Sequence, residues 1–357
     1  MKSSYCQCGT RVHFENTFCQ NCKKELGFLP EEGVLSALLT AGNKRWQSTV
    51  NNRTYRKCQN YAQHNACNWM VAETDTNSFC VSCRLSEIIP DLSNPENVKR
   101  WHRIERAKRR LLYSLFSLGL PVIDKAVDAE RGLSFRLMED RTHFSEFVNI
   151  LPERDRVMTG HFDGVITLNI EEADPVLREE MRARMQERYR TLLGHLRHES
   201  GHYYWDRLLS DSPAIAEFRS LFGDERADYE TTLKNYYNNG PVSNWQTNWI
   251  SAYASAHPWE DWAECWAHYL HMVDTLETAY DFGFDVNGAS NATYGQRFDR
   301  SYLASISINN LVDEWINLYV ALNEMNRSMG LADAYPFVLS PTIVNKLSFV
   351  HKVITGT

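Results

Sequence analysis

Apolar residues recur at helical spacing soon after the first quarter of the chain. Between residues 96 and 118 they are Trp101, Ile104, Leu111, Leu112, Leu115 and Phe116. Basic side chains fill the positions between them, so the apolar residues share one face of a helix. Gly119 and Pro121 follow at once, and both residue types end helices. The pattern therefore predicts a helix over residues 96–118.

Two later segments have the pattern of strands. Residues 132–138 alternate between apolar and polar positions, and residues 164–170 are rich in β-branched side chains. After a turn over residues 171–175 the pattern is helical to about residue 209, as one long helix or two in succession. From Pro258 onward it is again mostly helical. We expect an α+β fold in which a mostly helical domain carries a small β-sheet.

Composition narrows the class of protein. The chain has 357 residues, of which 43% are hydrophobic and 23% charged, which is typical of a globular protein and excludes a disordered or collagen-like chain. No run of 18 apolar residues is present, so we expect no membrane contact. The first residues lack the apolar stretch of a secretion signal. We therefore expect a cytoplasmic protein, in which disulfides are rare.

Charge divides the chain into two parts. Residues 1–112 contain 17 Lys and Arg against 10 Asp and Glu, whereas the remaining residues contain 21 against 35. A basic segment can attract nucleic acid, but the excess is modest and a solvated basic face is the more common explanation. A protein or nucleic-acid partner for the basic region is thus one hypothesis that the charge leaves open.

Eight of the nine cysteines lie in the first 83 residues and divide into two groups of four. They are Cys6, Cys8, Cys19 and Cys22 in the first group, and Cys58, Cys67, Cys80 and Cys83 in the second. Two residues between cysteines allow both thiolates to reach one metal ion, and two such pairs form the tetrahedral shell of structural zinc. His13 and His64 are alternative ligands. Cys265 stands apart and is expected to be a buried helix residue.

Segments this short cannot bury enough apolar surface to fold alone, so metal binding would supply the missing free energy. We therefore predict three parts. They are a first zinc ribbon over residues 1–30, a second zinc-binding module over residues 31–90, and a metallopeptidase-like domain over residues 91–357.

The second helical stretch contains His198-Glu199-Ser200-Gly201-His202. This is the His-Glu-x-x-His pattern, in which positions i and i+4 share a helix face and can both bind one zinc ion. Glu199 lies beside such an ion, where it could accept a proton from water. His195 precedes His198 by one turn and is an alternative ligand, although a packed or hydrogen-bonded histidine is the more common role at such a position.

A catalytic zinc needs a third protein ligand and an open position. The helix that begins near Pro258 carries Glu260 and Glu264 one turn apart among tryptophans, and buried carboxylates need partners. We favour Glu264 as the ligand, with Glu260 as the alternative. For the donor that stabilises a developing oxyanion, His257 and Tyr253 are the candidates because both precede this helix.

The chain resembles a known family at these positions. The run His198 to Asp206, the segment from His257 to Glu264 and the N-terminal cysteines are similar to the bacterial zinc-binding metallopeptidase family with an N-terminal zinc ribbon. The resemblance extends from the cysteines to about residue 325. It implies a gluzincin-type, zincin-like peptidase with two histidine ligands, one glutamate ligand and a glutamate base. The Trp-Ala-Glu element that ends at Glu264 also resembles the third-ligand element of lethal-factor-type zincins. Departures are the short Cys6-x-Cys8 spacing and Cys265 beside the expected ligand.

These observations predict a zinc metallopeptidase that acts on a peptide or protein substrate. One catalytic zinc would be bound by His198, His202 and Glu264 and would activate water, with Glu199 as general base. Two structural zinc ions would occupy the cysteine groups. The alternative is a zinc-ribbon module that binds nucleic acid or protein and carries a regulatory or inactive zincin body. In a third hypothesis the ribbons recruit the protein that is cleaved.

Overall fold

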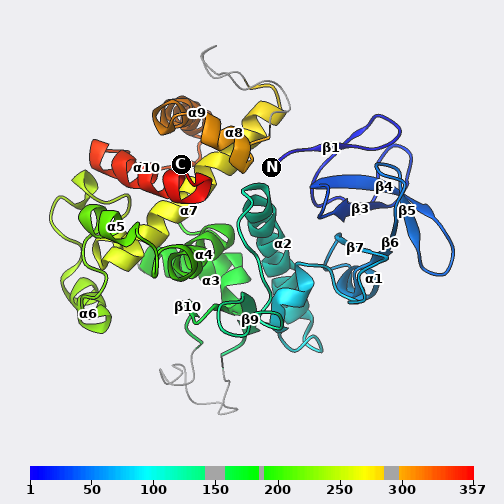
Figure 1. Ribbon diagram of the computed structural model, residues 1–357, viewed down its shortest axis with the longest axis horizontal. Helices are drawn as coiled ribbons and strands as arrows, with labels where there is room; N and C mark the ends of the chain where they lie inside the picture. The colour runs from blue at the N-terminus through cyan, green and yellow to red at the C-terminus, as the bar shows by residue number, and fades with distance from the viewer. Residues whose placement is uncertain (141–156, 185–188, 285–296) are drawn as a thin grey trace. The chain divides into compact units, whose positions relative to one another are not determined.

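A computed structural model of the chain describes residues 1–140, 157–184, 189–284 and 297–357 (Figure 1). Two compact units make up these residues. The first contains Met1–Phe116 and Pro121–Met181, and the second contains Ser117–Leu120 and Arg182–Thr357. The limits expected from the sequence at residues 30 and 90 stay a prediction about which parts fold independently.

The first unit begins with short strands that frame the cysteines. Strands β1 (Ser4–Tyr5) and β2 (Arg11–Val12) pair antiparallel. An antiparallel sheet in chain order follows, with strands β3 (Leu26–Leu29), β4 (Val34–Thr40), β5 (Trp46–Ser48), β6 (Thr54–Lys57) and β7 (Met70–Ala72). Helix α1 (Gln59–His64) lies between β6 and β7, and the short 3₁₀ helix η1 (Cys83–Leu85) follows β7. The first group of cysteines precedes β3 along the chain, and Cys58 and Cys67 of the second group lie between β6 and β7.

Helix α2 (Pro95–Ser117) and a mixed sheet complete the first unit. The helix predicted over residues 96–118 is present, and the face that carries Trp101, Ile104 and Leu111 is buried as its period requires. The mixed sheet has the order β10 (Gly160–Phe162), β11 (Val165–Asn169), β9 (Ser134–Met138), β8 (Ser86–Ile88). Both strands expected from the pattern are therefore present, as β9 and β11, and they pair parallel.

In its described residues, the segment expected to be helical up to residue 209 contains two α-helices. After η3 (Ile170–Ala173) come α3 (Pro175–Arg184) and α4 (Leu192–Leu208), while residues 185–188 lie outside the described ranges. The remaining elements are α5 (Ile215–Phe222), α6 (Tyr229–Asn239), η4 (Trp245–Thr247), η5 (Tyr253–Ser255), α7 (Pro258–Asp281), α8 (Arg300–Ser305), α9 (Ile308–Ser328) and α10 (Pro341–Thr355). The α+β class is confirmed.

Helix α7 is the centre of the second unit, and α4, α5, α9 and α10 all pack against it (Figure 1). Trp262 and Trp266 lie fully buried on this helix and contact rings from the neighbouring helices. A buried ion pair joins α10 to α7, because Lys346 Nζ lies 2.5 Å from Asp261 Oδ2. In the described part of the chain, no helix has both the length and the apolar character needed to cross a bilayer.

Candidate metal centres

Helix α4 presents the two histidines of the His-Glu-x-x-His pattern. The helix starts at a capped end, where the Thr191 side chain accepts a hydrogen bond of 3.0 Å from the Gly194 amide. His198 and His202 follow one turn apart on the same face, and both are buried. Their Nε2 atoms lie 3.1 Å apart. The helical spacing thus brings the two nitrogens to one point, as the sequence predicts.

Gly201, between the two histidines, allows α4 to approach α7 closely. A Cβ atom at this position would lie 2.9 Å from Ala263 Cα and 3.2 Å from Trp266 Cβ, which is closer than packed atoms normally come. Trp262 of α7 donates a 2.8 Å hydrogen bond to the Gly201 carbonyl across this contact. The close approach brings the acidic side chains of α7 within reach of the histidines.

The N-terminus of α7 sets the direction of those acidic side chains. His257 is the N-cap residue, and its Nδ1 accepts a 3.1 Å hydrogen bond from the Trp259 amide. Pro258 follows in the first turn, where its missing N–H costs nothing. Glu260 and Glu264 then lie one turn apart on the face toward α4.

Glu260 completes a group of three ligand atoms. Its Oε2 lies 3.0 Å from His198 Nε2 and 3.5 Å from His202 Nε2. Zinc bonds of about 2.0–2.1 Å at tetrahedral angles separate two ligand atoms by about 3.3 Å. We call His198, His202 and Glu260 the histidine–glutamate cluster. Three lone-pair atoms at these distances fit a zinc ion.

Glu264 contacts the other nitrogen of the same histidine. Its Oε1 lies 2.7 Å from His198 Nδ1, a distance at which an Nδ1–H would donate to this carboxylate and leave the Nε2 lone pair for a metal ion. Burial would raise the pKa of Glu264, but the bond with His198 lowers it to about 2, so the carboxylate is charged. A carboxylate behind a metal-binding histidine fixes the ring and increases its basicity. The arrangement therefore favours Glu260 as ligand and Glu264 as its support, the reverse of the sequence-based preference.

Glu199 lies on α4 directly beside the first histidine and is 4% exposed. Its Oε1 is 3.3 Å from His195 Nε2, so His195 faces the carboxylate and not the cluster. Among the described residues, Oε2 of Glu199 has no hydrogen-bond partner. Burial raises the pKa of Glu199, but His195 and the neighbouring histidines more than offset this and lower it. The carboxylate is therefore ionised at neutral pH and one of its oxygens can accept a proton.

Neither nitrogen of His257 is directed at a reacting group. Nδ1 caps α7, and Nε2 lies 3.1 Å from the carbonyl oxygen of Ala227. This favours a structural role for His257 over the predicted oxyanion donor. Tyr253, the other candidate, has its ring centroid 5.9 Å from that of His198.

Tyr229 is a residue that the sequence analysis missed. Its hydroxyl donates a 2.6 Å hydrogen bond to Glu260 Oε1. Burial and the neighbouring Glu260 carboxylate raise the pKa of Tyr229, so the phenol stays protonated and remains a donor. Residue 229 is far from both motifs along the chain and belongs to no pattern, so nothing in the sequence pointed to it.

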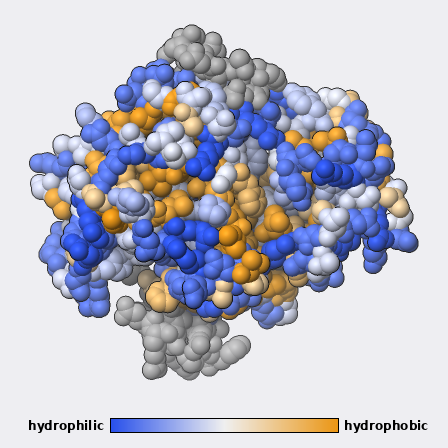
Figure 2. All heavy atoms as spheres, in the orientation of Figure 1, coloured by the Kyte–Doolittle hydropathy of each residue, from blue (hydrophilic) through white to orange (hydrophobic). Residues whose placement is uncertain are grey.

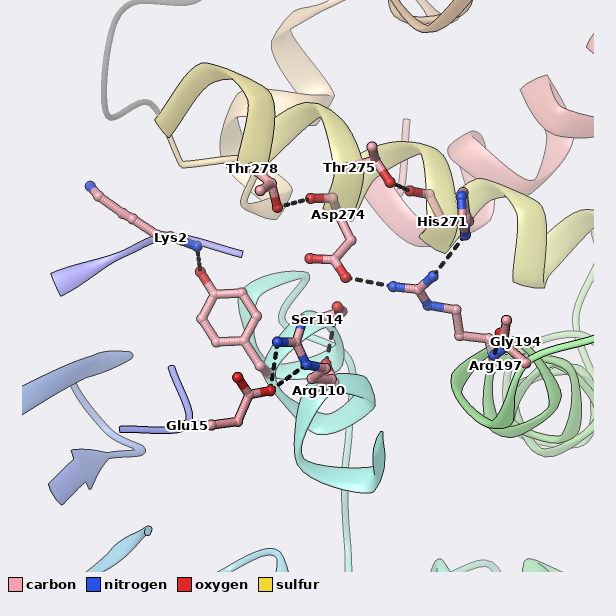
Figure 3. A network of polar contacts seen from close by, with 12 residues as sticks. Lys2, Glu15, Arg110, Ser114, Gly194, Arg197, His271, Asp274, Thr275 and Thr278 are labelled. Carbon is pink, nitrogen blue, oxygen red and sulfur yellow. Dashed lines mark hydrogen bonds and ion pairs between the residues drawn. The ribbon is translucent and has the colours of Figure 1, made fainter. Parts of the chain in front are cut away.

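A second set of polar contacts fixes how α4 lies along α7. Arg197 is buried, its Nη2 lies 2.5 Å from Asp274 Oδ2, and its Nη1 lies 3.2 Å from His271 Nδ1 (Figure 3). Burial and Arg197 lower the pKa of His271 to about 3, so this ring is neutral. His268 contacts Tyr335, with 2.8 Å between Nδ1 and the hydroxyl. These contacts hold the two helices in register and leave His268 and His271 outside the histidine–glutamate cluster.

The cysteines of the first unit form two clusters as expected. The first cysteine cluster is Cys6, Cys8, Cys19 and Cys22, and the second cysteine cluster is Cys58, Cys67, Cys80 and Cys83. All nine cysteines of the chain are free thiols. Sulfur atoms lie 3.5 Å apart in Cys6–Cys22, 3.6 Å in Cys8–Cys19 and 3.7 Å in Cys67–Cys80. Zinc–sulfur bonds of about 2.3 Å give tetrahedral separations of about 3.8 Å, so both clusters fit zinc.

The two cysteine clusters differ in exposure. All four residues of the second are buried, whereas Cys8 of the first is exposed. The Thr10 hydroxyl lowers the pKa of Cys8 to about 5. Beside the second cluster, the buried Arg109 of α2 donates a 2.7 Å hydrogen bond to the Ala66 carbonyl, next to Cys67. Its positive charge lies near sulfurs that are negative when they bind metal.

Comparison with known proteins identifies the family of the chain. The chain belongs to a family described as "putative zinc-binding metallo-peptidase", which it matches over residues 97–353. Residues 4–94 match a zinc-ribbon domain. Uncharacterized proteins of Mycobacterium bovis and of two strains of Mycobacterium tuberculosis are 40% identical to the chain over 356 residues, which is 99% of this chain and 95% of theirs. No solved structure matches the chain. The family expected from the sequence motifs is thus confirmed.

Proposed function

We propose that the chain hydrolyses peptide bonds as a zinc peptidase, with His198, His202 and Glu260 as zinc ligands and Glu199 as general base. The observation that carries this proposal is the convergence of three lone-pair atoms at 3.0–3.5 Å. A bound cation would neutralise the buried Glu260 carboxylate, and a buried charge needs such a partner. Family membership supports the same chemistry.

When bound, zinc would supply Lewis-acid polarisation of a carbonyl group and of water. The residues of the chain would do the rest. Glu199 Oε2, buried without a partner among the described residues, accepts a proton from the attacking water and returns it to the leaving amine. His195 Nε2 lies 3.3 Å from Oε1 of the same carboxylate, so Oε2 is the oxygen that remains available to accept the proton.

Glu264 acts through His198. The bond of 2.7 Å to Nδ1 fixes the tautomer in which Nε2 carries the lone pair. Arg197, paired with Asp274, keeps the motif helix from sliding along α7. An inactive zincin body, the alternative hypothesis, would have no need for an ionised Glu199 beside three ligands at zinc distances.

The decisive experiment compares wild-type protein with Glu199→Gln on a fluorogenic peptide library, with the zinc content of each measured by mass spectrometry. Glutamine keeps the shape of the side chain but cannot act as a base, so cleavage should fall by about 10²–10⁴-fold while zinc is retained. Cleavage at the wild-type rate by the zinc-loaded variant would remove Glu199 from the mechanism. A chelator should abolish wild-type cleavage, and restored zinc should recover it.

A further inference from the structure

The carboxylate of Glu260 has two different partners on its two oxygens. Oε2 faces the two imidazole nitrogens, at 3.0 Å and 3.5 Å, while Oε1 accepts a 2.6 Å hydrogen bond from the Tyr229 hydroxyl. The side chain of Glu260 is 1% exposed, so water does not compete for Oε1. The tyrosine therefore occupies the oxygen that would otherwise be free to turn toward a zinc ion bound in the histidine–glutamate cluster.

Tyr229 comes from an element at the surface. It is the first residue of α6, whose N-cap residue Asp228 accepts a 2.7 Å hydrogen bond from the Thr231 amide. No residue of α6 is buried, and Tyr229 itself is 41% exposed. The helix carries mainly hydrophilic side chains, as the space-filling view shows over α6 (Figure 2). Packing in the core therefore does not explain why Tyr229 points inward.

Two contacts direct the tyrosine toward Glu260. His257 lies 3.1 Å from the carbonyl oxygen of Ala227, two residues before Tyr229, and so ties the segment that leads into α6 to the start of α7. The Tyr229 ring lies edge-on to the His257 ring, with 5.2 Å between centroids, and 5.8 Å from the Trp259 ring. His257 thus serves the cluster by positioning another residue.

We propose that Tyr229 is a positioning residue that restricts Glu260 to a single ligand oxygen. The inference rests on the zinc site of the proposed function. If Oε1 were released, the carboxylate could offer both oxygens and occupy the position that a catalytic site must leave open for water. Hydrogen-bond partners of ligands typically change metal affinity or activity by about 10–100-fold.

The test replaces the hydroxyl alone. Tyr229→Phe keeps the ring and its contacts with His257 and Trp259, and Tyr237→Phe, at a 58% exposed position of the same helix, is the matched control. Competition with a chelator measures zinc affinity, with the cysteine clusters counted separately. Cobalt loaded into the same site reports its coordination number by absorption. For Tyr229→Phe we expect zinc affinity to change by about 10–100-fold and the cobalt spectrum to shift toward higher coordination. We also expect kcat to fall more than KM rises.

Each outcome decides a different point. If wild-type protein binds zinc in the histidine–glutamate cluster and Tyr229→Phe equals wild type in affinity and cobalt spectrum, the role of Tyr229 is refuted and the proposed function stands. If wild-type protein binds metal only at the cysteines, both fail. Equal shifts in Tyr237→Phe would assign the effect to α6 as a whole and also refute the specific role. Thermal melting confirms that the compared variants are folded.

Discussion

The cysteine clusters and the histidine–glutamate cluster gather their ligands by different means. Each cysteine cluster draws its four ligands from one short segment of the chain, from Cys6 to Cys22 or from Cys58 to Cys83. The histidine–glutamate cluster joins two long helices that bury tryptophans between them and are tied by Arg197 and Asp274. We infer that the cysteine regions need metal in order to fold, whereas the helices are folded before metal binds.

The two kinds of cluster would also differ in whether a bound zinc ion can react with a substrate. Four thiolates close a tetrahedral shell, which leaves no position for a substrate. Two imidazoles and one carboxylate would leave a fourth position open on a zinc ion bound to them. Within one chain, a closed shell would serve stability and an open shell would serve reaction.

The largest expected effect is the loss of the second cysteine cluster. Replacing Cys80 and Cys83 by Ser should remove one zinc per chain and unfold that region, because structural zinc contributes about 10–16 kcal/mol in small zinc domains. The histidine–glutamate cluster should keep its metal. Zinc analysis and thermal melting measure both effects, with Cys265→Ser, a buried cysteine outside the clusters, as control. Unchanged zinc content and melting in the double variant would exclude a metal site there.

The second-largest expected effect is a difference in zinc affinity between variants of the two glutamates of α7. Glu260→Ala removes the only anion of the histidine–glutamate cluster, while Glu264→Ala removes a partner of His198 and should weaken zinc by about 10–100-fold. We expect Glu260→Ala to bind zinc more weakly than Glu264→Ala in chelator competition, and both proteins to melt cooperatively. The opposite order would restore Glu264 as the ligand, as the sequence motif suggests.

A smaller effect is expected where the two helices touch. Gly201→Ala places a methyl group 2.9 Å from the Ala263 backbone, and such overpacking costs about 1–3 kcal/mol. The free energy of unfolding of the second unit should fall by this amount, and zinc should bind more weakly because the ligands separate. Gly160→Ala, where a methyl group meets nothing within 4 Å, is the control. If Gly201→Ala matched the wild type in denaturant unfolding, close helix approach would not be what builds the site.

The smallest effect concerns the two cysteine clusters themselves. The exposed Cys8 gives a chelator direct access to the first cluster, while the second is buried beside Arg109. We expect zinc to leave the first cluster roughly tenfold faster than the second. Groups around a metal site typically change metal affinity by about 10–100-fold, and the expected difference lies at the lower end of that range. In the Glu260→Ala variant, whose histidine–glutamate cluster should bind zinc weakly, stopped-flow release into a chromogenic chelator should show two phases from the cysteine clusters, and Cys8→Ser should affect only the fast one. A single phase for both clusters would contradict the difference in burial as the cause.

The sequence by itself determined whatever depends on residues near one another in the chain. The spacing of Cys19 and Cys22, the i and i+4 positions of His198 and His202, and the apolar period of α2 all follow from local geometry, and the structure has each of them. The family membership was also readable from these motifs.

Only the tertiary structure decided which groups from distant segments meet. Glu260 and Glu264 lie one turn apart on the same helix, so their spacing in the sequence cannot show which of them is the better placed ligand. The close packing of α7 on Gly201 places Glu260 near Nε2 of His198 and Glu264 near Nδ1. Tyr229 reaches Glu260 because His257 ties Ala227 to the start of α7, a contact between residues thirty positions apart. Such contacts depend on helix packing, in which a shift of about one ångström changes the partner of a side chain. Sequence patterns contain no distances of that kind, because they record only the order of residues along the chain.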